Sequence, residues 1–244
     1  SAVLVGNQAT YTPNANYNGP DSFTFTASDG TLVSDPATVS VTVNPVNDSF
    51  TFGPVTIAPT NPTTNDTLTA SFSLDDPDGD VVHGYGWYII NDNIILIVGN
   101  GPMLDLSIAG NGNKGDVINA VVTFTDTGDP APLVYVVTSK VTVVNTPPVA
   151  QAQQNVGAIE DTPLDVPLGA TDADEGDSFI FGVAEQPVNG NVTILGNHAT
   201  YIPNPNYNGP DSFTFTASDG MAISAPASVN IIVGAVNDAP ILTT

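Results

Sequence analysis

The feature that most constrains this chain is an internal repeat. Residues 16–30, with the sequence NYNGPDSFTFTASDG, recur unchanged as residues 206–220, which lie 190 positions further along. The identity continues on the N-terminal side of this block, where Gly6, Ala9, Thr10, Tyr11, Pro13 and Asn14 recur as Gly196, Ala199, Thr200, Tyr201, Pro203 and Asn204. The sequence between the copies is unrelated to them, so the repeat predicts a tandem array of domains. The two copies match over the length of about half a domain.

The strand pattern predicts an all-β fold. Residues 22–27, 38–43, 121–125 and 140–144 alternate between apolar and polar side chains with the period of two that half-buried strands show. No segment has a convincing helical period, and 22 glycines and 21 prolines divide the strands at short intervals. Short strands at this spacing are typical of Greek-key β-sandwiches of the Ig-like kind.

The linkers predict the domain boundaries. Val46-Asn47-Asp48, which recurs as Val236-Asn237-Asp238, and the segment Asn145-Thr146-Pro147-Pro148 each follow a final strand. We therefore expect the back half of one domain type at 1–48, a second type at 49–146, a complete domain of the first type at 147–238 and the start of another repeat at 239–244. The front half that 1–48 lacks corresponds to 147–190, so either upstream chain or another polypeptide is expected to supply it.

The charge balance excludes several partners. The chain has 25 acidic residues against two lysines, Lys114 and Lys140, and its net charge is −23. Nucleic acid binding requires clustered cations, so it is excluded, and anionic membrane surfaces are disfavoured. The absence of cysteine excludes disulfides and thiolate metal sites. No segment is long and apolar enough for a membrane span, and any secretion signal or anchor is expected outside these residues.

The acidic residues of 147–238 form short motifs rather than a scatter. Glu160-Asp161 opens the range, an acidic run from Asp172 to Asp177 follows a strand, and Asp219-Gly220 ends another. This layout, with TYIPNPNYNGPDSFTFTASDG between the motifs and Val236-Asn237-Asp238 at the exit, resembles the cadherin-like and bacterial Ig-like repeats of large microbial surface proteins and adhesins. The resemblance covers 147–238 as a whole domain and 1–48 as a half.

The resemblance implies calcium bound at domain junctions. Carried over position by position, the residues that it implies as ligands are Glu160, Asp172, Asp174, Asp219, Asn237 and Asp238, with Asp29, Asn47 and Asp48 in the half-domain. The chain departs from animal cadherins because it lacks their LDRE-type motif, which leaves open whether a junction holds several ions, one or none.

The middle range has acids of its own, among which we expect Asp76, Asp78 and Asp126 as ligands. Calcium takes six to eight oxygen ligands, and Asp and Asn on glycine-containing turns can supply them. Asx-Gly pairs are also ordinary turn formers, so a single pair can equally be interpreted as a turn that binds no metal. The linker at Asn145 carries no acid, so calcium there is expected to depend on Asp66, Asp126 and Glu160.

Two apolar features are interpreted as packing. Trp87, the only tryptophan, is expected in the core between two sheets, as is usual for this strand of a sandwich. Residues 94–98 (IILIV) are expected as a buried strand, and as an aggregation hazard if they are exposed.

Recognition motifs and catalysis find little support. Lys114-Gly115-Asp116 has the form of an integrin-type tripeptide but is interpreted as a turn. His83 and His198 are far apart in sequence and have no nucleophile motif beside them, so the chain is not expected to be an enzyme.

We therefore expect an extracellular structural repeat region of a cell-surface adhesin or stalk that calcium stiffens at its junctions. Its partners would be neighbouring repeats or identical subunits, with a surface glycan or protein bound at a tip outside this sequence. A self-assembling filament or sheath whose subunits dock by strands, and a carbohydrate- or protein-binding module, remain as alternatives.

Overall fold

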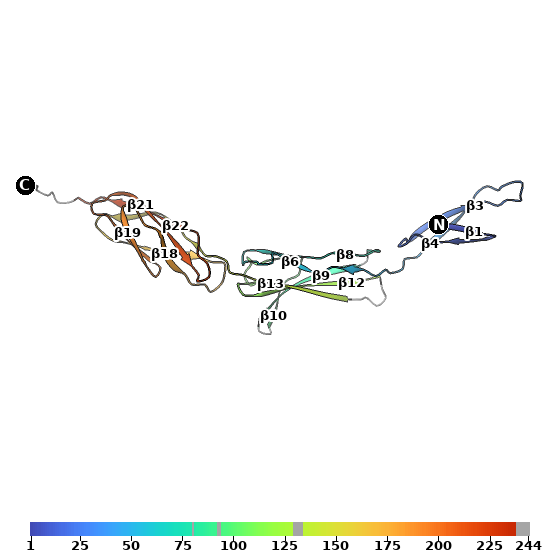
Figure 1. Ribbon diagram of the computed structural model, residues 1–244, viewed down its shortest axis with the longest axis horizontal. Helices are drawn as coiled ribbons and strands as arrows, with labels where there is room; N and C mark the ends of the chain where they lie inside the picture. The colour runs from blue at the N-terminus through green and yellow to red at the C-terminus, as the bar shows by residue number, and fades with distance from the viewer. Residues whose placement is uncertain (80, 92–93, 129–133, 238–244) are drawn as a thin grey trace, which may run out of the picture. The chain divides into compact units, whose positions relative to one another are not determined.

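The computed structural model describes residues 1–79, 81–91, 94–128 and 134–237 (Figure 1). All regular elements in these ranges are strands, which confirms the predicted all-β class, and no helix in them has the length and apolar character that crossing a membrane requires. The chain divides into two compact units. The first contains Ser1–Thr56, Ser71–Tyr85 and Val121–Thr138, and the second contains Ile57–Ala70, Gly86–Ala120 and Ser139–Thr244.

The C-terminal part of the second unit is a two-sheet sandwich, which we call the C-terminal sandwich. One sheet has the order β15-β22-β21-β18 and the other the order β16-β20-β19, with β14 paired to β17 beside them. Its strands are β14 (Val149–Ala150), β15 (Gln153–Ile159), β16 (Leu164–Pro167), β17 (Ala170–Thr171), β18 (Ile180–Glu185), β19 (Gly190–Leu195), β20 (His198–Pro203), β21 (Gly209–Ser218) and β22 (Ala227–Gly234).

Alternation along the strands builds the core of this sandwich. In β21, Phe213, Phe215 and Ala217 are buried, and the threonines between them are only partly covered. The valines and isoleucine at alternate positions of β22 are buried as well. Tyr201 of β20 is also fully buried, and its hydroxyl donates a hydrogen bond of 2.9 Å to Asp211 Oδ2. The polar atom of this core tyrosine is therefore satisfied.

The first 43 residues fold as two hairpins, which we call the N-terminal hairpin pair. They consist of β1 (Ala2–Val5), β2 (Gln8–Tyr11), β3 (Gly19–Phe25) and β4 (Ala37–Val43). β1 pairs with β2 and β3 with β4 in the same registers that β19 and β20, and β21 and β22, adopt 190 residues later. The repeated sequence therefore forms the same hairpins in both places.

The middle of the chain forms three sheets, with the orders β10-β9-β12-β13, β11-β7-β6 and β5-β8, and the strands β6, β7, β9, β12 and β13 contribute residues to both units. Their bounds are β5 (Thr51–Phe52), β6 (Thr56–Ala58), β7 (Thr67–Ser71), β8 (Leu74–Asp75), β9 (Val81–Asn91), β10 (Ile94–Gly99), β11 (Met103–Asp105), β12 (Val117–Asp126) and β13 (Val134–Thr142).

Aromatic residues fill the core of this region. In the first unit, Phe124 is fully buried and its ring stacks on that of Phe52 with a centroid separation of 4.8 Å. In the second unit, Trp87 is fully buried and its Nε1 donates to the carbonyl of Gly101 at 2.8 Å. The prediction that Trp87 is a core residue is therefore confirmed.

The prediction that residues 94–98 form a buried strand is wrong about burial. The segment lies in β10, but Ile95, Leu96 and Ile97 are between 50% and 69% exposed. Among the described strands, β10 is at the end of its sheet and has β9 as its one partner, so its side chains do not have neighbours on both sides as those of a central strand do.

The repeat provides a matched test of burial. Replacing Phe215, which is 0% exposed, with alanine should destabilise the C-terminal sandwich by about 3–5 kcal/mol, because it removes a large core side chain and leaves a cavity. The equivalent Phe25→Ala change should cost about 1 kcal/mol or less, since Phe25 is 46% exposed. Opening free energies from amide hydrogen exchange in β21 and β3 would measure both. Equal costs would contradict the difference in burial.

Candidate metal centres

Acidic side chains of the first unit surround the strandless segment 44–50, which we call the first linker. The side-chain amide of Asn47 donates to Asp126 Oδ2 at 3.0 Å, and the backbone N–H of Asp48 donates to Asp78 Oδ2 at 2.8 Å. Asp126 is the last residue of β12, and Asp78 lies in the loop after β8. Two consecutive linker residues are thus bound to two carboxylates, one at the end of a strand and one in a loop.

The local sequence explains how these loops hold their shape. Asp76 Oδ2 accepts the backbone N–H of Val81 at 2.8 Å, which closes the acidic loop, and this bond lowers the pKa of Asp76. Gly79 has a φ of 74°, a conformation that glycine adopts without strain. Asp126 Oδ1 accepts the N–H of Gly128 at 3.2 Å, and only 3% of Asp126 is exposed. The carboxylates therefore fix the loops that present them.

Several oxygens of this cluster are buried and have no hydrogen-bond donor. They are Asn47 Oδ1, Asp76 Oδ1 and Asp78 Oδ1. An unpaired buried polar atom costs about 1–3 kcal/mol, and more when it carries charge, so native proteins usually provide a partner for it. Amide and carboxylate oxygens are the ligand type that calcium takes.

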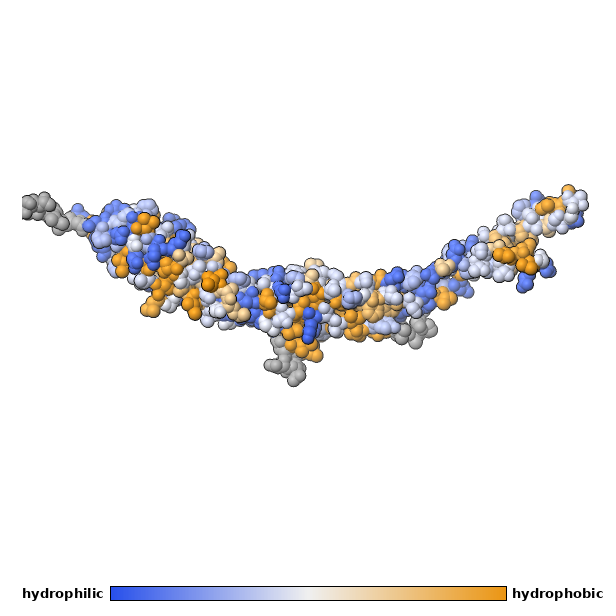
Figure 2. Space-filling model, in the orientation of Figure 1, coloured by the Kyte–Doolittle hydropathy of each residue, from blue (hydrophilic) through white to orange (hydrophobic). Residues whose placement is uncertain are grey.

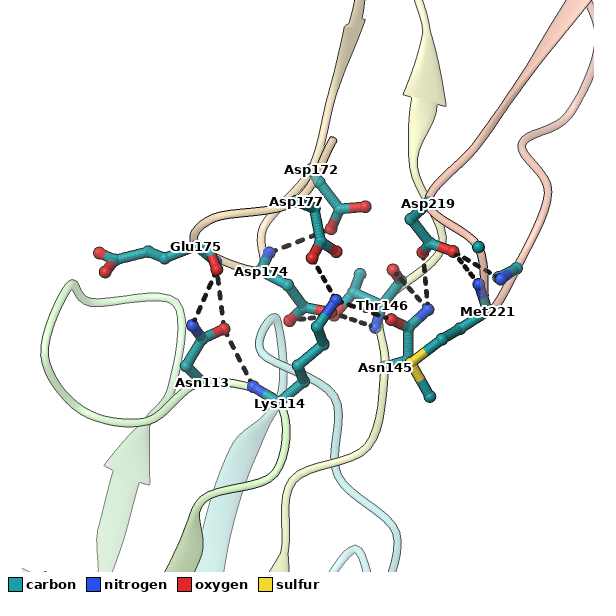
Figure 3. Close-up of polar contacts among 12 residues, drawn as sticks. Asn113, Lys114, Asn145, Thr146, Asp172, Asp174, Glu175, Asp177, Asp219 and Met221 are labelled. Carbon is teal, nitrogen blue, oxygen red and sulfur yellow. Dashed lines mark hydrogen bonds and ion pairs between the residues drawn. The ribbon is translucent and has the colours of Figure 1, made fainter. Parts of the chain in front are cut away.

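A second cluster, in the second unit, surrounds the strandless segment 143–148, which we call the second linker (Figure 3). The side-chain amide of Asn145 donates to Asp219 Oδ2 at 2.8 Å. The backbone N–H of Thr146 donates to Asp174 Oδ2 at 2.7 Å, and Asp174 Oδ1 accepts from the Thr64 hydroxyl. Asp174 is 3% exposed, and both of its carboxylate oxygens are therefore paired.

The two linkers use the same arrangement although their sequences differ. In each, an asparagine amide binds the acid at the end of a long strand, which is Asp126 in the first case and Asp219 in the second. In each, the next backbone N–H binds the second acid of an Asp-x-Asp loop, which is Asp78 or Asp174. The same pair of hydrogen bonds therefore forms whether the residue after the asparagine is an aspartate (Asp48) or a threonine (Thr146).

Three carboxylates at the second linker lie close enough to share one cation. Asp172, Asp177 and Asp219 each offer an oxygen, and these oxygens all lie within 4.8 Å of one another. Asp172 Oδ2 and Asp177 Oδ2 are buried without a hydrogen-bond partner, and the side chain of Asp177 is 9% exposed. The residues present thus fit a hard cation that binds oxygen.

The environment of each carboxylate sets the direction of its pKa shift. Burial raises the pKa of Asp172, an N–H donor at Asp174 opposes this, and the charges of Asp174, Asp177 and Asp219 raise the pKa further. The pKa of Asp219 is instead lowered, first by the N–H of Ala222 and then by the amide of Asn145. The ionised form of Asp172 is therefore disfavoured in this cluster, whereas that of Asp219 is favoured.

A lysine enters the second cluster. The Lys114 ammonium is paired with Asp177 Oδ1 and lies 3.5 Å from Asn145 Oδ1, and Figure 3 shows its side chain extended into the acidic group. The hydrogen bond from Lys114 to Asp177 raises the pKa of this lysine. Lys114-Gly115-Asp116 therefore presents its cation to Asp177.

The remaining expected ligands lie elsewhere. Glu160 Oε1 accepts the N–H of Val236, close to the predicted exit of its domain, and Asp29 closes an exposed turn by accepting the N–H groups of Thr31 and Leu32. Asn237 is exposed, and Asp238 lies outside the described residues.

The three acids expected at the second linker have hydrogen-bond partners of their own, and their shared role as ligands stays a prediction. Asp126 binds Asn47 of the first linker, Glu160 binds Val236, and Asp66 caps the backbone N–H of Thr63 at 2.7 Å. The acids that face the second linker come from the 172–177 loop and from Asp219, which directly follows β21. Sequence reasoning did not single out Asn145, although it follows a final strand as Asn47 does.

The fold and the two clusters define a class of protein, which is a tandem array of β-sandwich domains with acidic loops at its linkers. The bacterial Ig domain family matches residues 1–42 and 145–232, which together are more than half of the chain. The chain belongs to this family, and the resemblance to bacterial Ig-like repeats is confirmed.

Solved structures of cadherin type are also similar to the chain. Extracellular cadherin domains 1–5 of protocadherin gamma B2 align at 16% identity and a TM-score of 0.37, over 91% of this chain and 47% of that one. Domains 1–2 of human protocadherin-24 align at 15% identity and a TM-score of 0.38, over 78% of this chain and 100% of that one. This chain thus spans about half the length of the first of these.

An enzyme appears among the structural matches as well. An endo-fucoidan hydrolase of glycoside hydrolase family 107 aligns at 18% identity and a TM-score of 0.31, over 97% of this chain and 37% of that one. No curated protein matches the chain.

The opposite pKa shifts give a pH test in the presence of a chelator. Because the pKa of Asp172 is raised above its ordinary value of 3.8, its ionised form opposes folding at neutral pH. Asp172→Asn should therefore raise the melting temperature at pH 7, and the gain should vanish below about pH 4, where the carboxyl group is protonated in both states.

Asp219→Asn is the matched control. The pKa of Asp219 is lowered, so its ionised form adds stability above the ordinary pKa, and this contribution is lost as pH falls through the lower folded pKa. Asp219→Asn should thus lower the melting temperature at pH 7. Shifts of the same sign for the two variants in a calorimetric pH series would contradict this assignment.

Proposed function

We propose that the chain is an extracellular structural repeat region of a bacterial surface adhesin or stalk, and that calcium stiffens its linkers. The observation that carries the proposal is the set of buried carboxylate and amide oxygens without hydrogen-bond donors at both linkers. The match to the bacterial Ig domain family supports the structural part of the proposal.

The charge of the chain makes a cation at these places favourable. A net charge of −23 with only two lysines opposes compaction by self-repulsion, and bound cations reduce that repulsion. At the first linker, Asn47, Asp76 and Asp78 would hold the ion. At the second linker, Asp172, Asp177 and Asp219 would hold it. The ion supplies positive charge and coordinates oxygens, and the chain supplies their placement.

Stiffening follows from what the linker residues already do. Asn47 and Asp48 tie the first linker to the loops of Asp126 and Asp78, and a cation shared by these groups would add further bonds to the same linker. Bending the linker would then separate carboxylates from their counter-ion. The proposed role is therefore mechanical, and we propose no catalytic step.

Lys114 distinguishes the two proposed sites. Its ammonium places a positive charge beside Asp177, so a divalent cation at the second linker would have to displace it or bind beside it. The donorless oxygens of the first cluster have no lysine beside them among the contacts of the described residues. We therefore propose that the first linker binds calcium more tightly.

Calcium titration of the chain by isothermal calorimetry tests the proposal. Saturating calcium should raise the melting temperature and chelation should lower it, because a ligand that binds only the folded state adds about 2.7 kcal/mol at one hundred times its Kd. Asp78→Asn and Asp172→Asn should each remove heat from one site. Magnesium should substitute poorly, because it demands a tighter and more regular geometry. Identical melting in calcium and in chelator would overturn the proposal.

The two lysines provide a matched pair for the second site. Lys114→Met should raise its calcium affinity about tenfold, because removing an adjacent positive charge is worth on the order of 1.4 kcal/mol or more. Lys140→Met, at an exposed position of β13, should leave both affinities unchanged. If both substitutions change the calcium affinity of the second site equally, the affinity depends only on net charge, and the proposed role of Lys114 is contradicted.

A further inference from the structure

The β9–β10 hairpin presents apolar side chains to solvent on both of its faces. On one face, the cross-strand pair Ile90 and Ile95 is 44% and 65% exposed, and Ile97 beside them is 69% exposed. On the other face, Leu96 pairs with the buried Ile89 and is itself 50% exposed. Figure 2 shows apolar surface on this hairpin. The solvated face of an antiparallel sheet is usually polar, and contiguous exposed apolar side chains mark contact surfaces.

The outer edge of β10 is open among the described strands, where β9 is its one partner. Edge strands usually carry a charge, a proline or a bulge that prevents pairing with another chain. Lys140 lies in β13 at the opposite end of this sheet, and Asp165 and Glu185 lie in the end strands β16 and β18. β10 contains no charged residue or proline, and its register shift comes after Ile97, so residues 94–97 pair regularly. This edge is therefore suited to strand addition.

A hollow of about 410 Å³ lies beside the hairpin within the second unit. Its apolar lining consists of Ile89, Leu96, Leu106, Ala109 and Ala173, and its other lining residues are polar or glycine. A residue that an added strand places opposite Leu96 lies on the same face of the sheet as Leu96. An apolar residue at that position would therefore lie beside this hollow and cover Leu96.

The charge of the chain favours a second copy as the occupant. Residues 81–91 and 94–104 contain no Asp, Glu, Lys or Arg, and Asp92 lies between them, in a chain whose net charge is −23. A basic partner would be steered to the acidic loops and would find no counter-charge on β10. Two acidic copies repel each other where carboxylates face carboxylates, and β10 has none to oppose. An uncharged edge thus lets two copies of this chain meet.

We propose that two copies of the chain form a dimer by antiparallel pairing of their β10 strands about a two-fold axis at Leu96. In this register Leu96 faces the second copy's Leu96, and Ile95 faces the second copy's Ile97. All three side chains are at least 50% exposed in the single chain and become covered in the pair. Apolar β-branched residues opposite one another stabilise an antiparallel ladder.

The dimer is independent of the proposed metal sites, because β10 contains none of their ligands. It is reversible, since a single strand edge is smaller than a standard interface. The two sheets become one continuous sheet across the axis, so the contact joins one chain to another side by side by backbone hydrogen bonds.

A cross-linking experiment tests the register. Because the chain has no cysteine, a single introduced thiol reports contact with a second copy. Leu96→Cys should form a disulfide-linked dimer under mild oxidation, because a residue on the axis faces its own counterpart with Cβ atoms about 4.5–5.5 Å apart. Ile232→Cys is the matched control, since Ile232 is also 50% exposed but lies in β22, which has a partner on each side. Equal cross-linking of both variants would overturn the proposal.

Sedimentation of charge variants tests the same contact. Ile97→Lys should weaken the dimer about tenfold or more, because it places an unpaired charge against apolar side chains even though it reduces the net negative charge. Ile223→Lys should leave the dimer unchanged, since Ile223 is 66% exposed and lies outside β10. Adding Ile95→Asp to Ile97→Lys should restore association, because each lysine then faces an aspartate of the second copy. Failure of this double variant to recover would contradict the register.

Amide exchange of the unmodified chain does not depend on any variant that fails to fold. In chelator and at about 0.15 M salt, where surface charges are screened, exchange in β10 should slow as the chain concentration rises from micromolar towards millimolar. Exchange in β22 should not change. A chain that stays monomeric over this range, with constant exchange in β10, would overturn the proposal and leave the surface to a partner of another sequence. So would a dimer in which β10 exchanges as in the monomer, because its contact would lie elsewhere.

Discussion

The structure depends on how an acidic chain accommodates carboxylates that it buries at its linkers. Asp126 and Asp174 are each 3% exposed, and both accept hydrogen bonds from a linker residue. These bonds hold the linkers, but they leave other oxygens of the same clusters without donors. Because the chain has only two lysines, it has few charges of its own to place there. The proposed cation sites follow from this imbalance.

The chain contains two internal comparisons, one between its linkers and one between its repeated hairpins. The two linkers repeat one hydrogen-bond scheme, but Lys114 enters only the second cluster among the described contacts. Comparing the two linkers therefore isolates the effect of a lysine placed beside the carboxylates. The hairpins of β1–β4 repeat those of β19–β22, yet only the latter are covered, so the contribution of the front half is visible as the difference between Phe25 and Phe215. In the first comparison the hydrogen-bond scheme is kept while one neighbour changes, and in the second the sequence itself is nearly constant.

The sequence predicted the β-sandwich class, the core position of Trp87 and the acidic loops, because period-two alternation and Asx-Gly turns are local signals. It did not predict which acids meet. Asp126 was expected at the second linker and lies at the first, since the pairing depends on how distant strand ends come together. The pairing of Lys114 with Asp177 is of the same kind, because 63 residues separate them. β10 was expected to be buried because its composition is apolar, but composition does not say that a strand is at the end of its sheet. The domain ranges inferred from the linkers stay a prediction.

The most direct test of the central claim is anomalous diffraction from crystals of the chain grown with terbium in place of calcium. The account predicts an anomalous peak at the first linker, bound by the oxygens of Asn47, Asp76 and Asp78, and a weaker one beside Asp172 and Asp177, where Lys114 competes. A map with no peak at either linker, in which hydrogen-bond donors satisfy these oxygens, would contradict it. The repeats would then be spacers whose linkers hold no metal.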